Sequence, residues 1–290
     1  MREYQIITDT NSDLPKDYVT SKNLIQVPQY TLLDGVTYEG AEGIDAADFY
    51  ERMAAGSEPQ SQAINPAVCE DKFREVLDAG KDILYISFSS ALSSSYNIAV
   101  MTANELKDEY PDAKIVIVDT LSASLGEGIL VMRAIDLKES GKTIDEVASI
   151  IENDKLHEVT LFTVDTLKYL QRGGRISKTA AVMGTVINIK PLMNVNNAGN
   201  LAASGKEKGR RKAISALLNI METKMTDEYK DMNVRVGIAH GNCMDEVERV
   251  KAAITERFGI TEFVVNDVNP SIGVHSGPGT ICIAFFGTER

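Results

Sequence analysis

Short apolar runs recur along the first half of the chain, and each is followed by polar residues. Between these runs, apolar residues return at helical spacing in 67–77 and 96–105, which predicts helices there. Strand, polar loop and helix in repeated order are typical of a parallel sheet with helices on both faces. The three predicted strands are Tyr4–Thr8, Ile83–Ser87 and Ile115–Val118.

Polar residues follow each of these three strands. Asp9 follows the first strand, a serine-rich loop follows the second, and Asp119 follows the third. In open α/β sheets, ligands bind outside the carboxyl ends of the parallel strands. We therefore expect these polar residues to meet at one edge of the sheet and to line a binding site.

The second half of the chain has a different pattern, with a helix at Ala213–Lys224 and further short apolar strands. This pattern predicts a mixed α/β domain, and the change of pattern places a domain boundary near residues 157–158. We expect domains at 1–157 and 158–290, packed closely because no Pro-rich linker separates them. The predicted strands are Val159–Thr163, Val234–His240, Glu262–Val265 and Thr280–Phe286.

Composition narrows the possible classes of protein. Of 290 residues, 43% are apolar, and 30 Lys and Arg against 42 Asp and Glu give a net charge of −12. This is typical of a globular protein, and it argues against a general nucleic-acid binder. Three scattered cysteines indicate neither a disulfide framework nor a zinc site. With no apolar run long enough for a membrane span or signal peptide, we expect a metal-free, cofactor-free cytoplasmic protein.

Six serines occur within nine residues at 87–95, between a predicted strand and a predicted helix. Backbone N–H groups at a helix start suit a carboxylate or phosphate, and serine hydroxyls add donors without adding charge. Helix capping explains one or two of these serines, so the remaining hydroxyls favour an anion site. No GxSxG motif surrounds them, which argues against a serine nucleophile.

Positive charge is concentrated in one segment of this acidic chain. Between Asp165 and Lys212, ten basic residues face two acidic ones, so this segment carries +8 and the rest of the chain −20. A surface with this charge would attract an anionic partner. The more ordinary interpretation is that these side chains are simply exposed to solvent and bind nothing. The basic residues are Lys168, Arg172, Arg175, Lys178, Lys190, Lys206, Lys208, Arg210, Arg211 and Lys212.

Three glycine-containing segments could shape a site. In 172–177 (RGGRIS), arginines flank two glycines, and they could hold a carboxylate or phosphate. In 273–280 (GVHSGPGT), His275 lies in a tight loop where it could contact an anion or simply bond a backbone carbonyl. The segment 124–128 (SLGEG) is either the start of a helix or a second wall of a cleft, and we favour the helix start.

Taken in order, several motifs of this chain resemble the DegV family of bacterial fatty acid-binding proteins. They occur in family order and span nearly the whole chain, so the set is specific although no single motif is. The motifs are TDTNSDLP at 8–15, LSSSY at 92–96, VD at 118–119, SLG at 124–126, TLKYLQRGGRIS at 166–177, IKP at 189–191, residues 206–213 and HSGPG at 275–279.

The resemblance implies two α/β domains with one fatty acid in a tunnel between them. In the family, a threonine of a TSQ motif and a serine of an LSGTY loop hold the carboxylate. Ser93 matches that serine, while the TSQ segment is Gln60-Ser61-Gln62 here, so either Gln60 or Ser61 replaces the threonine, and we favour Ser61. Lys208 stands where the family usually has an arginine, which weakens the case for a bidentate contact there.

We therefore expect Ser61, Ser93 and His275 to bind a long-chain fatty acid carboxylate, with Gln60, Ser95 and Lys208 as supporting residues. The basic residues expected to face a protein partner are Arg172, Arg175, Arg210 and Arg211.

The family resemblance implies a carrier without catalytic residues of its own. Such a carrier presents the fatty acid to a separate fatty acid kinase subunit and delivers the acyl-phosphate to an acyltransferase of phospholipid synthesis. Two alternatives are a dihydroxyacetone-kinase-like subunit that uses His275 on a small hydroxy-ketone, and a nucleic-acid-binding regulator. The second alternative is disfavoured because no aromatic residues interleave the basic ones.

Overall fold

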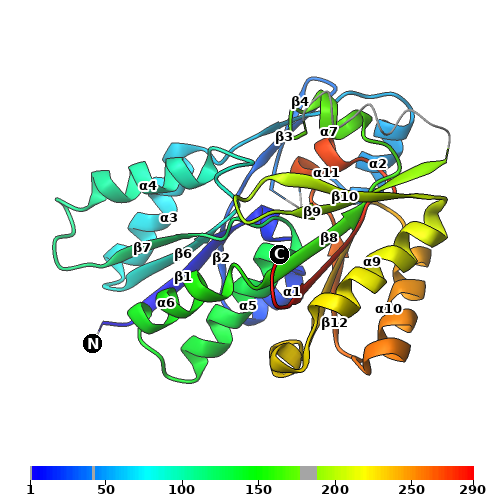
Figure 1. The fold of residues 1–290 in the computed structure, drawn as a ribbon. Helices are drawn as coiled ribbons and strands as arrows, with labels where there is room; N and C mark the ends of the chain where they lie inside the picture. The colour runs from blue at the N-terminus through cyan, green and yellow to red at the C-terminus, as the bar shows by residue number, and fades with distance from the viewer. Residues whose placement is uncertain (1, 41–42, 177–187) are drawn as a thin grey trace.

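The computed structural model describes residues 2–40, 43–176 and 188–290. These residues form an α/β fold with a parallel sheet, a mixed sheet and a small antiparallel sheet (Figure 1). The expected fold class, a parallel N-terminal sheet followed by a mixed C-terminal sheet, is confirmed.

The N-terminal sheet has the strand order β2-β1-β6-β7, and its described strand pairs are all parallel. Successive residues of a strand face opposite sides of a sheet, so Ile83 packs toward α3 and α4 while Leu84 packs toward α5 and α6. The strands are β1 (Tyr4–Asp9), β2 (Ile25–Val27), β6 (Asp82–Ser87) and β7 (Ile115–Asp119). The helices are α1 (Lys16–Ser21), α3 (Pro66–Asp78), α4 (Ser95–Leu106), α5 (Leu125–Glu139) and α6 (Ile144–Asp154), with the short 3-10 helix η1 (Thr10–Ser12).

The C-terminal sheet has the order β10-β9-β8-β13-β11-β12, with β11 and β12 parallel and the other described pairs antiparallel. Helices α9 and α10 cover one face, and α5 packs on the other. The strands are β8 (Glu158–Thr163), β9 (Ile189–Val195), β10 (Leu201–Lys208), β11 (Val236–His240), β12 (Phe263–Asp267) and β13 (Ile281–Phe286). The helices are α7 (Lys168–Arg172), α9 (Arg210–Lys224), η3 (Asp227–Met232), α10 (Met244–Phe258) and α11 (Pro270–Ser276).

A third sheet joins β3 (Tyr30–Leu33) to β4 (Val36–Glu39) and β5 (Gln60–Gln62), all antiparallel. Helix α2 (Ala46–Ala54) lies between β4 and β5 in the chain. From this helix, the buried Tyr50 hydroxyl donates to the carbonyl of Val268 at 2.9 Å, just before α11. This contact and the packing of α11 on β3 and β5 hold the small sheet against the C-terminal half.

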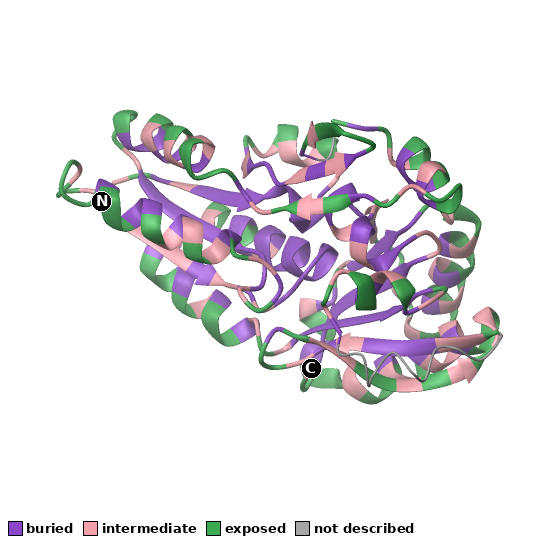
Figure 2. Ribbon diagram, turned by 90° about the horizontal axis from the view of Figure 1, so that it is seen from above, coloured by how far each residue is buried: buried purple, intermediate pink, exposed green. Residues whose placement is uncertain are grey.

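Helix α5 lies at the centre of the molecule, between the two large sheets (Figure 2). Every residue from Leu125 to Met132 is buried, as expected for a helix that is covered on all sides. One apolar cluster therefore runs from the N-terminal sheet through α5 to β13 of the C-terminal sheet. The domain boundary at residues 157–158 coincides with the start of β8, but the division into two domains stays a prediction.

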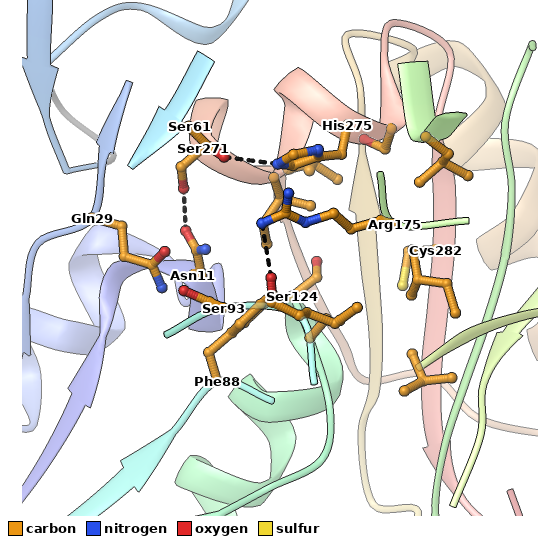
Figure 3. Close-up of a pocket in the computed structure, with 18 of the residues that line it drawn as sticks. Asn11, Gln29, Ser61, Phe88, Ser93, Ser124, Arg175, Ser271, His275 and Cys282 are labelled. Atoms are coloured by element: carbon orange, nitrogen blue, oxygen red, sulfur yellow. Dashed lines mark hydrogen bonds between the residues drawn. The ribbon is translucent and has the colours of Figure 1, made fainter. Parts of the chain in front are cut away.

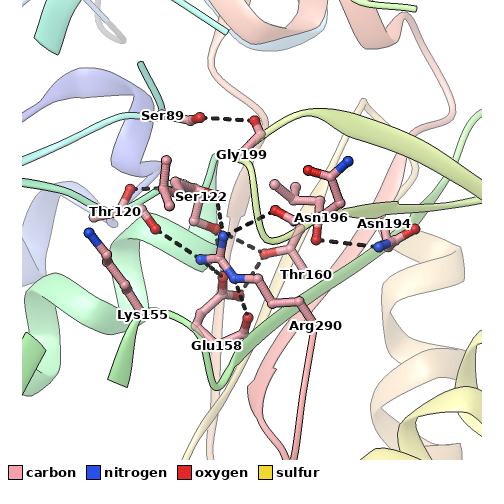
Figure 4. Close-up of polar contacts among 12 residues, drawn as sticks. Ser89, Thr120, Ser122, Lys155, Glu158, Thr160, Asn194, Asn196, Gly199 and Arg290 are labelled. Carbon is pink, nitrogen blue, oxygen red and sulfur yellow. Dashed lines mark hydrogen bonds and ion pairs between the residues drawn. The ribbon is translucent and has the colours of Figure 1, made fainter. Parts of the chain in front are cut away.

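Arg290, the last residue described, binds to buried groups between the two large sheets (Figure 4). The side chains of Arg290 and Glu158 are both fully buried, and Arg290 Nη2 lies 3.3 Å from Glu158 Oε2. Arg290 also donates to the carbonyls of Thr120 at 2.9 Å and Glu158 at 3.0 Å. Glu158 in turn accepts hydrogen bonds from Ser122 at 2.7 Å and Thr160 at 2.6 Å. Removing either partner of such a buried, hydrogen-bonded ion pair is strongly destabilising, because the other charge is left buried and uncompensated.

None of the helices among the described residues is long and apolar enough to cross a membrane. The same residues contain no group of three or more His, Cys, Asp or Glu side chains that could hold a metal ion.

Candidate functional site

The carboxyl edge of the parallel sheet is shaped by the two aspartates expected there. Asp9 Oδ2 accepts a hydrogen bond from the backbone N of Phe88 at 3.1 Å, and Asp119 Oδ1 accepts one from Ser90 N at 3.1 Å. Asp9 is fully buried, and burial raises its pKa to about 6. Both carboxylates therefore fix the serine-rich loop and do not face a ligand themselves.

Beside this loop lies a cavity of about 280 Å³ (Figure 3). This volume is close to the lower end of the roughly 300–1,000 Å³ that is usual for small-molecule sites. Apolar side chains form much of the wall, and polar side chains gather at one end. The apolar lining residues are Ala63, Phe88, Leu92, Ala123, Phe162, Leu170, Val195, Leu201, Val268, Ile272 and Cys282.

Three predicted carboxylate-binding residues, Ser61 on β5, Ser93 before α4 and His275 on α11, all line this cavity. Ser61 Oγ lies 2.7 Å from His275 Nε2. The other ring nitrogen, Nδ1, is buried with no hydrogen-bond partner among the described residues. An N–H group without an acceptor costs more than a bare nitrogen lone pair, so we assign the proton to Nε2. His275 then donates to Ser61, whose own hydroxyl proton is free for a ligand.

The His275 ring is neutral in this position. Burial and the nearby Arg175 and Arg172 guanidinium groups lower its pKa to about 3. Gly173 allows the ring to approach, because a Cβ atom at this position would lie 1.9 Å from His275 Nδ1. The second glycine of the pair, Gly174, has a positive φ of 72° and ends the turn. The two glycines of the basic segment therefore have separate roles, close approach and backbone conformation.

A second set of hydrogen bonds orients Ser93. The backbone N of Ser95 donates to Ser93 Oγ at 3.3 Å, and the two hydroxyl oxygens lie 2.9 Å apart. Ser95 Oγ also accepts from Ile64 N at 3.4 Å, so its own proton is available to donate to Ser93. Ser93 Oγ then accepts hydrogen bonds from Ser95, and its own proton is available to a ligand in the cavity. Ser95 is buried and supports Ser93 from outside the lining of the cavity.

Arg175 brings a positive charge to the wall of the cavity. Its Nη1 donates to the carbonyl of Gly173 at 2.6 Å, and its Nη2 donates to the carbonyl of Leu92 at 2.9 Å. Partial burial lowers the pKa of this guanidinium, which remains charged because arginine has a very high intrinsic pKa. The sequence placed Arg175 on a partner-facing surface, whereas the structure places its side chain in the cavity wall.

The other expected residues lie outside the cavity lining. Gln60 is exposed on β5, next to Ser61, and Lys208 is exposed at the end of β10. Arg172 is exposed, pairs with Glu58 at 3.2 Å and lies over the Tyr169 ring.

The basic residues at the start of α9 differ from one another. Arg210 is mostly buried, and its Nε donates to Glu246 at 2.6 Å, while Arg211 beside it is exposed. Ser177 and Lys178, which belong to the basic segment, lie outside the described residues. The basic surface therefore consists of exposed residues around α9 and β10, and it does not include Arg210 or Arg175 as free charges.

Several polar lining residues were not predicted to contact a ligand, among them Asn11, Gln29, Ser124, Thr160 and Ser271. For Ser124 the sequence left two interpretations open, a helix start and a wall of a cleft, and both hold: the residue precedes α5, lines the cavity and donates to Asp13. Asn11 lies within the motif at 8–15, which was the only sequence signal for it. Gln29 and Ser271 gave no signal, because single polar residues near strand or helix ends are common.

Comparison with known proteins gives matches over the whole chain. The family model described as "Uncharacterised protein, DegV family" matches residues 3–288. A DegV domain-containing protein of Clostridium perfringens is 36% identical over 294 residues, which covers 100% of this chain and 99% of that protein. Another, from Streptococcus pyogenes, is 33% identical and covers 98% of each chain.

Solved structures give the same result for the fold. The structure described as fatty acid binding of a DegV family protein from Thermus thermophilus has a TM-score of 0.88 and 28% identity, covering 99% of this chain and 100% of that chain. The Fatty Acid Kinase (Fak) B3 protein of Streptococcus pneumoniae, loaded with linoleic acid, has a TM-score of 0.84 at 21% identity, covering 98% and 99%. The matched fold and the full-length relatives together show that this chain belongs to the DegV family.

Proposed function

We propose that this protein binds one long-chain fatty acid in the cavity, with the carboxylate held by the hydroxyls of Ser61 and Ser93. The protein then acts as a lipid-binding carrier and not as an enzyme. The observation that carries the proposal is that both hydroxyls line one cavity and each has a partner within the protein. With the His275 proton on Nε2, Ser61 Oγ accepts from the ring, and Ser93 Oγ accepts from Ser95 N, so each hydroxyl proton is left for an acceptor in the cavity.

The remaining wall suits an acyl chain. Phe162, Val195, Leu201 and Cys282 come from four strands of the C-terminal sheet and line the cavity together with Phe88 and Leu92 of the serine-rich loop. Burying each CH₂ group of a ligand contributes about 0.8 kcal/mol, so a long tail supplies most of the affinity and the hydroxyls fix the head. Fatty acid binding in the Thermus thermophilus relative supports this assignment.

The acyl-phosphate step requires a second protein. The sequence contains no GxxxxGK[ST] motif to hold the phosphates of ATP, so a separate fatty acid kinase subunit would act on the presented carboxylate. The exposed basic residues around α9 and β10, including Lys208 and Arg211, would attract an acidic surface of that kinase. An acyltransferase of phospholipid synthesis would then receive the acyl-phosphate.

A hydroxy-ketone enzyme fits the cavity less well. His275 would need a free nitrogen for covalent or acid–base chemistry, but its Nε2 contacts Ser61 and its Nδ1 faces Gly173. A small hydroxy-ketone would also leave most of the apolar wall of the cavity without contact. A nucleic-acid regulator would not use the cavity.

The direct test is organic extraction of the purified protein followed by mass spectrometry of the lipids. We expect about one long-chain fatty acid per chain, or uptake of palmitate or oleate after delipidation. A protein that yields no fatty acid and takes up neither ligand would refute the proposal. Dihydroxyacetone serves as the comparison ligand in a thermal-shift assay, where it should not raise the melting temperature.

A further inference from the structure

Asn11 presents an unpaired amide group to the cavity. The residue is only 3% exposed, and it lines the same cavity as Ser93 (Figure 3). The Ser271 hydroxyl lies within hydrogen-bonding distance of both Asn11 Oδ1 and Asn269 Oδ1, and we assign its one proton to Asn11, the shorter contact. The backbone N of Asn11 donates to Asp9 Oδ1 at 3.0 Å. No described residue accepts a hydrogen bond from its Nδ2, so an amide donor is left for a group in the cavity.

Gln29 presents the complementary group. It is also 3% exposed, lines the cavity, and lies beside Asn11 because its Nε2 donates to the same Asp9 oxygen at 3.0 Å (Figure 3). That hydrogen bond fixes the amide so that Oε1 is the remaining acceptor, and no described residue donates to it. A ligand that shields these two atoms from water without bonding them would lose about 1–3 kcal/mol for each, so we expect the bound ligand to offer a partner to both.

One free donor beside one free acceptor matches a hydroxyl group, which accepts one hydrogen bond and donates another. A carboxylate does not match, because Gln29 Oε1 would repel it. A methylene group would leave both amides unsatisfied or would require them to hold a water molecule. The pair lines the same cavity as Ser61 and Ser93, on its polar side in Figure 3, so we place the matching hydroxyl near the head of the ligand.

We propose that Asn11 and Gln29 form a hydroxyl-binding subsite, and that this protein prefers 2- or 3-hydroxy fatty acids over unsubstituted ones. This inference rests on the proposed function, fatty acid binding in the cavity. The carboxylate stays at Ser61 and Ser93. The ligand hydroxyl accepts from Asn11 Nδ2 and donates to Gln29 Oε1. Asn11 and Gln29 are then specificity-determining residues of the same cavity.

The test compares palmitic acid with 2-hydroxy- and 3-hydroxypalmitic acid by calorimetric titration of the delipidated protein. Two hydrogen bonds of ordinary net strength predict that at least one hydroxylated ligand binds about fivefold tighter or more. Asn11→Leu should reduce this ratio to about one, while Ser271 keeps Asn269 Oδ1 as an acceptor at 3.1 Å. Asn104→Leu, the same change at an exposed position of α4, is the matched control and should keep the ratio.

Each outcome decides one question. Equal or weaker binding of both hydroxylated ligands to the unchanged protein overturns the subsite, while tight palmitate binding still supports the proposed function. An Asn11→Leu protein that keeps the preference also overturns the subsite. Failure to bind any of the three ligands overturns the proposed function itself. If Asn11→Leu does not fold, the ratio measured on the unchanged protein still decides.

Discussion

Replacing Gly173 with alanine tests how His275 orients Ser61. The backbone of Gly173 has φ −76°, which alanine adopts without strain, so the substitution acts only through the added methyl group. That Cβ atom would lie 1.9 Å from His275 Nδ1 and 2.7 Å from Cε1, much closer than atoms can pack. The imidazole must therefore move away from α7 by roughly 1 Å or more.

The size of the effect follows from the contact that this movement breaks. Nε2 of His275 lies 2.7 Å from Ser61 Oγ, so a displacement of the ring by roughly 1 Å disrupts the distance or the angle of this hydrogen bond. Without that donor, the Ser61 proton is no longer directed at the ligand carboxylate. A hydrogen bond to a charged group contributes about 1.5–3 kcal/mol, so the affinity for palmitate should fall roughly ten- to 150-fold.

The assay is calorimetric titration of delipidated protein with palmitate, combined with thermal unfolding. Gly174→Ala is the matched control, because a Cβ atom there meets nothing within 4 Å. Because Gly174 has a positive φ of 72°, its replacement by alanine should lower the free energy of unfolding by about 1 kcal/mol but should not move the His275 ring. Unchanged palmitate affinity in Gly173→Ala would refute the role of His275 as an orienting residue. An equal loss in Gly174→Ala would show that the turn, and not the ring contact, controls binding.

Three further predictions test other contacts. Ser93→Ala should weaken palmitate binding about tenfold or more in the same titration, and unchanged affinity would remove Ser93 from the head-group site. Arg290→Met leaves the Glu158 carboxylate buried without its cation and should lower the free energy of unfolding by about 3–5 kcal/mol in urea, whereas a change below about 1 kcal/mol would contradict the buried pair. His275 has a pKa of about 3 in the folded protein, below the value of an unfolded histidine, so its contribution to stability is present above pH 6.5 and is lost as pH falls toward 3. Its ring NMR signals should not titrate between pH 8 and 5, and a midpoint near 6.5 would show that the ring is solvated.

The hydrophobic pattern predicted the large sheets better than the small one. Strands such as Ile281–Phe286 are uniformly buried and apolar, so their sequence reveals them. Strand β5 is Gln-Ser-Gln and β10 is mostly polar, because each lies at the edge of its sheet and faces solvent. Neither has an apolar pattern, although β5 carries Ser61. The family resemblance located Ser61 where periodicity could not.

The polar end of the cavity depends on contacts between distant parts of the chain. Ser61 and His275 are separated by 214 positions, and the proximity of Gly173 to His275 is visible only once α7 packs against α11. The sequence favoured an anion site at the serine-rich loop and expected one or two of its serines to cap the helix, yet the Ser94 side chain makes no capping hydrogen bond, and Ser93 and Ser95 bond each other. Spacing along the chain identified the donors but not their directions.

The most direct test of this account is a crystal structure of the protein with bound palmitate. We expect the two carboxylate oxygens within hydrogen-bonding distance of Ser61 Oγ and Ser93 Oγ, and the tail along Phe162 and Cys282. A carboxylate bound elsewhere, or a palmitate-saturated protein whose cavity holds only water, would contradict the account.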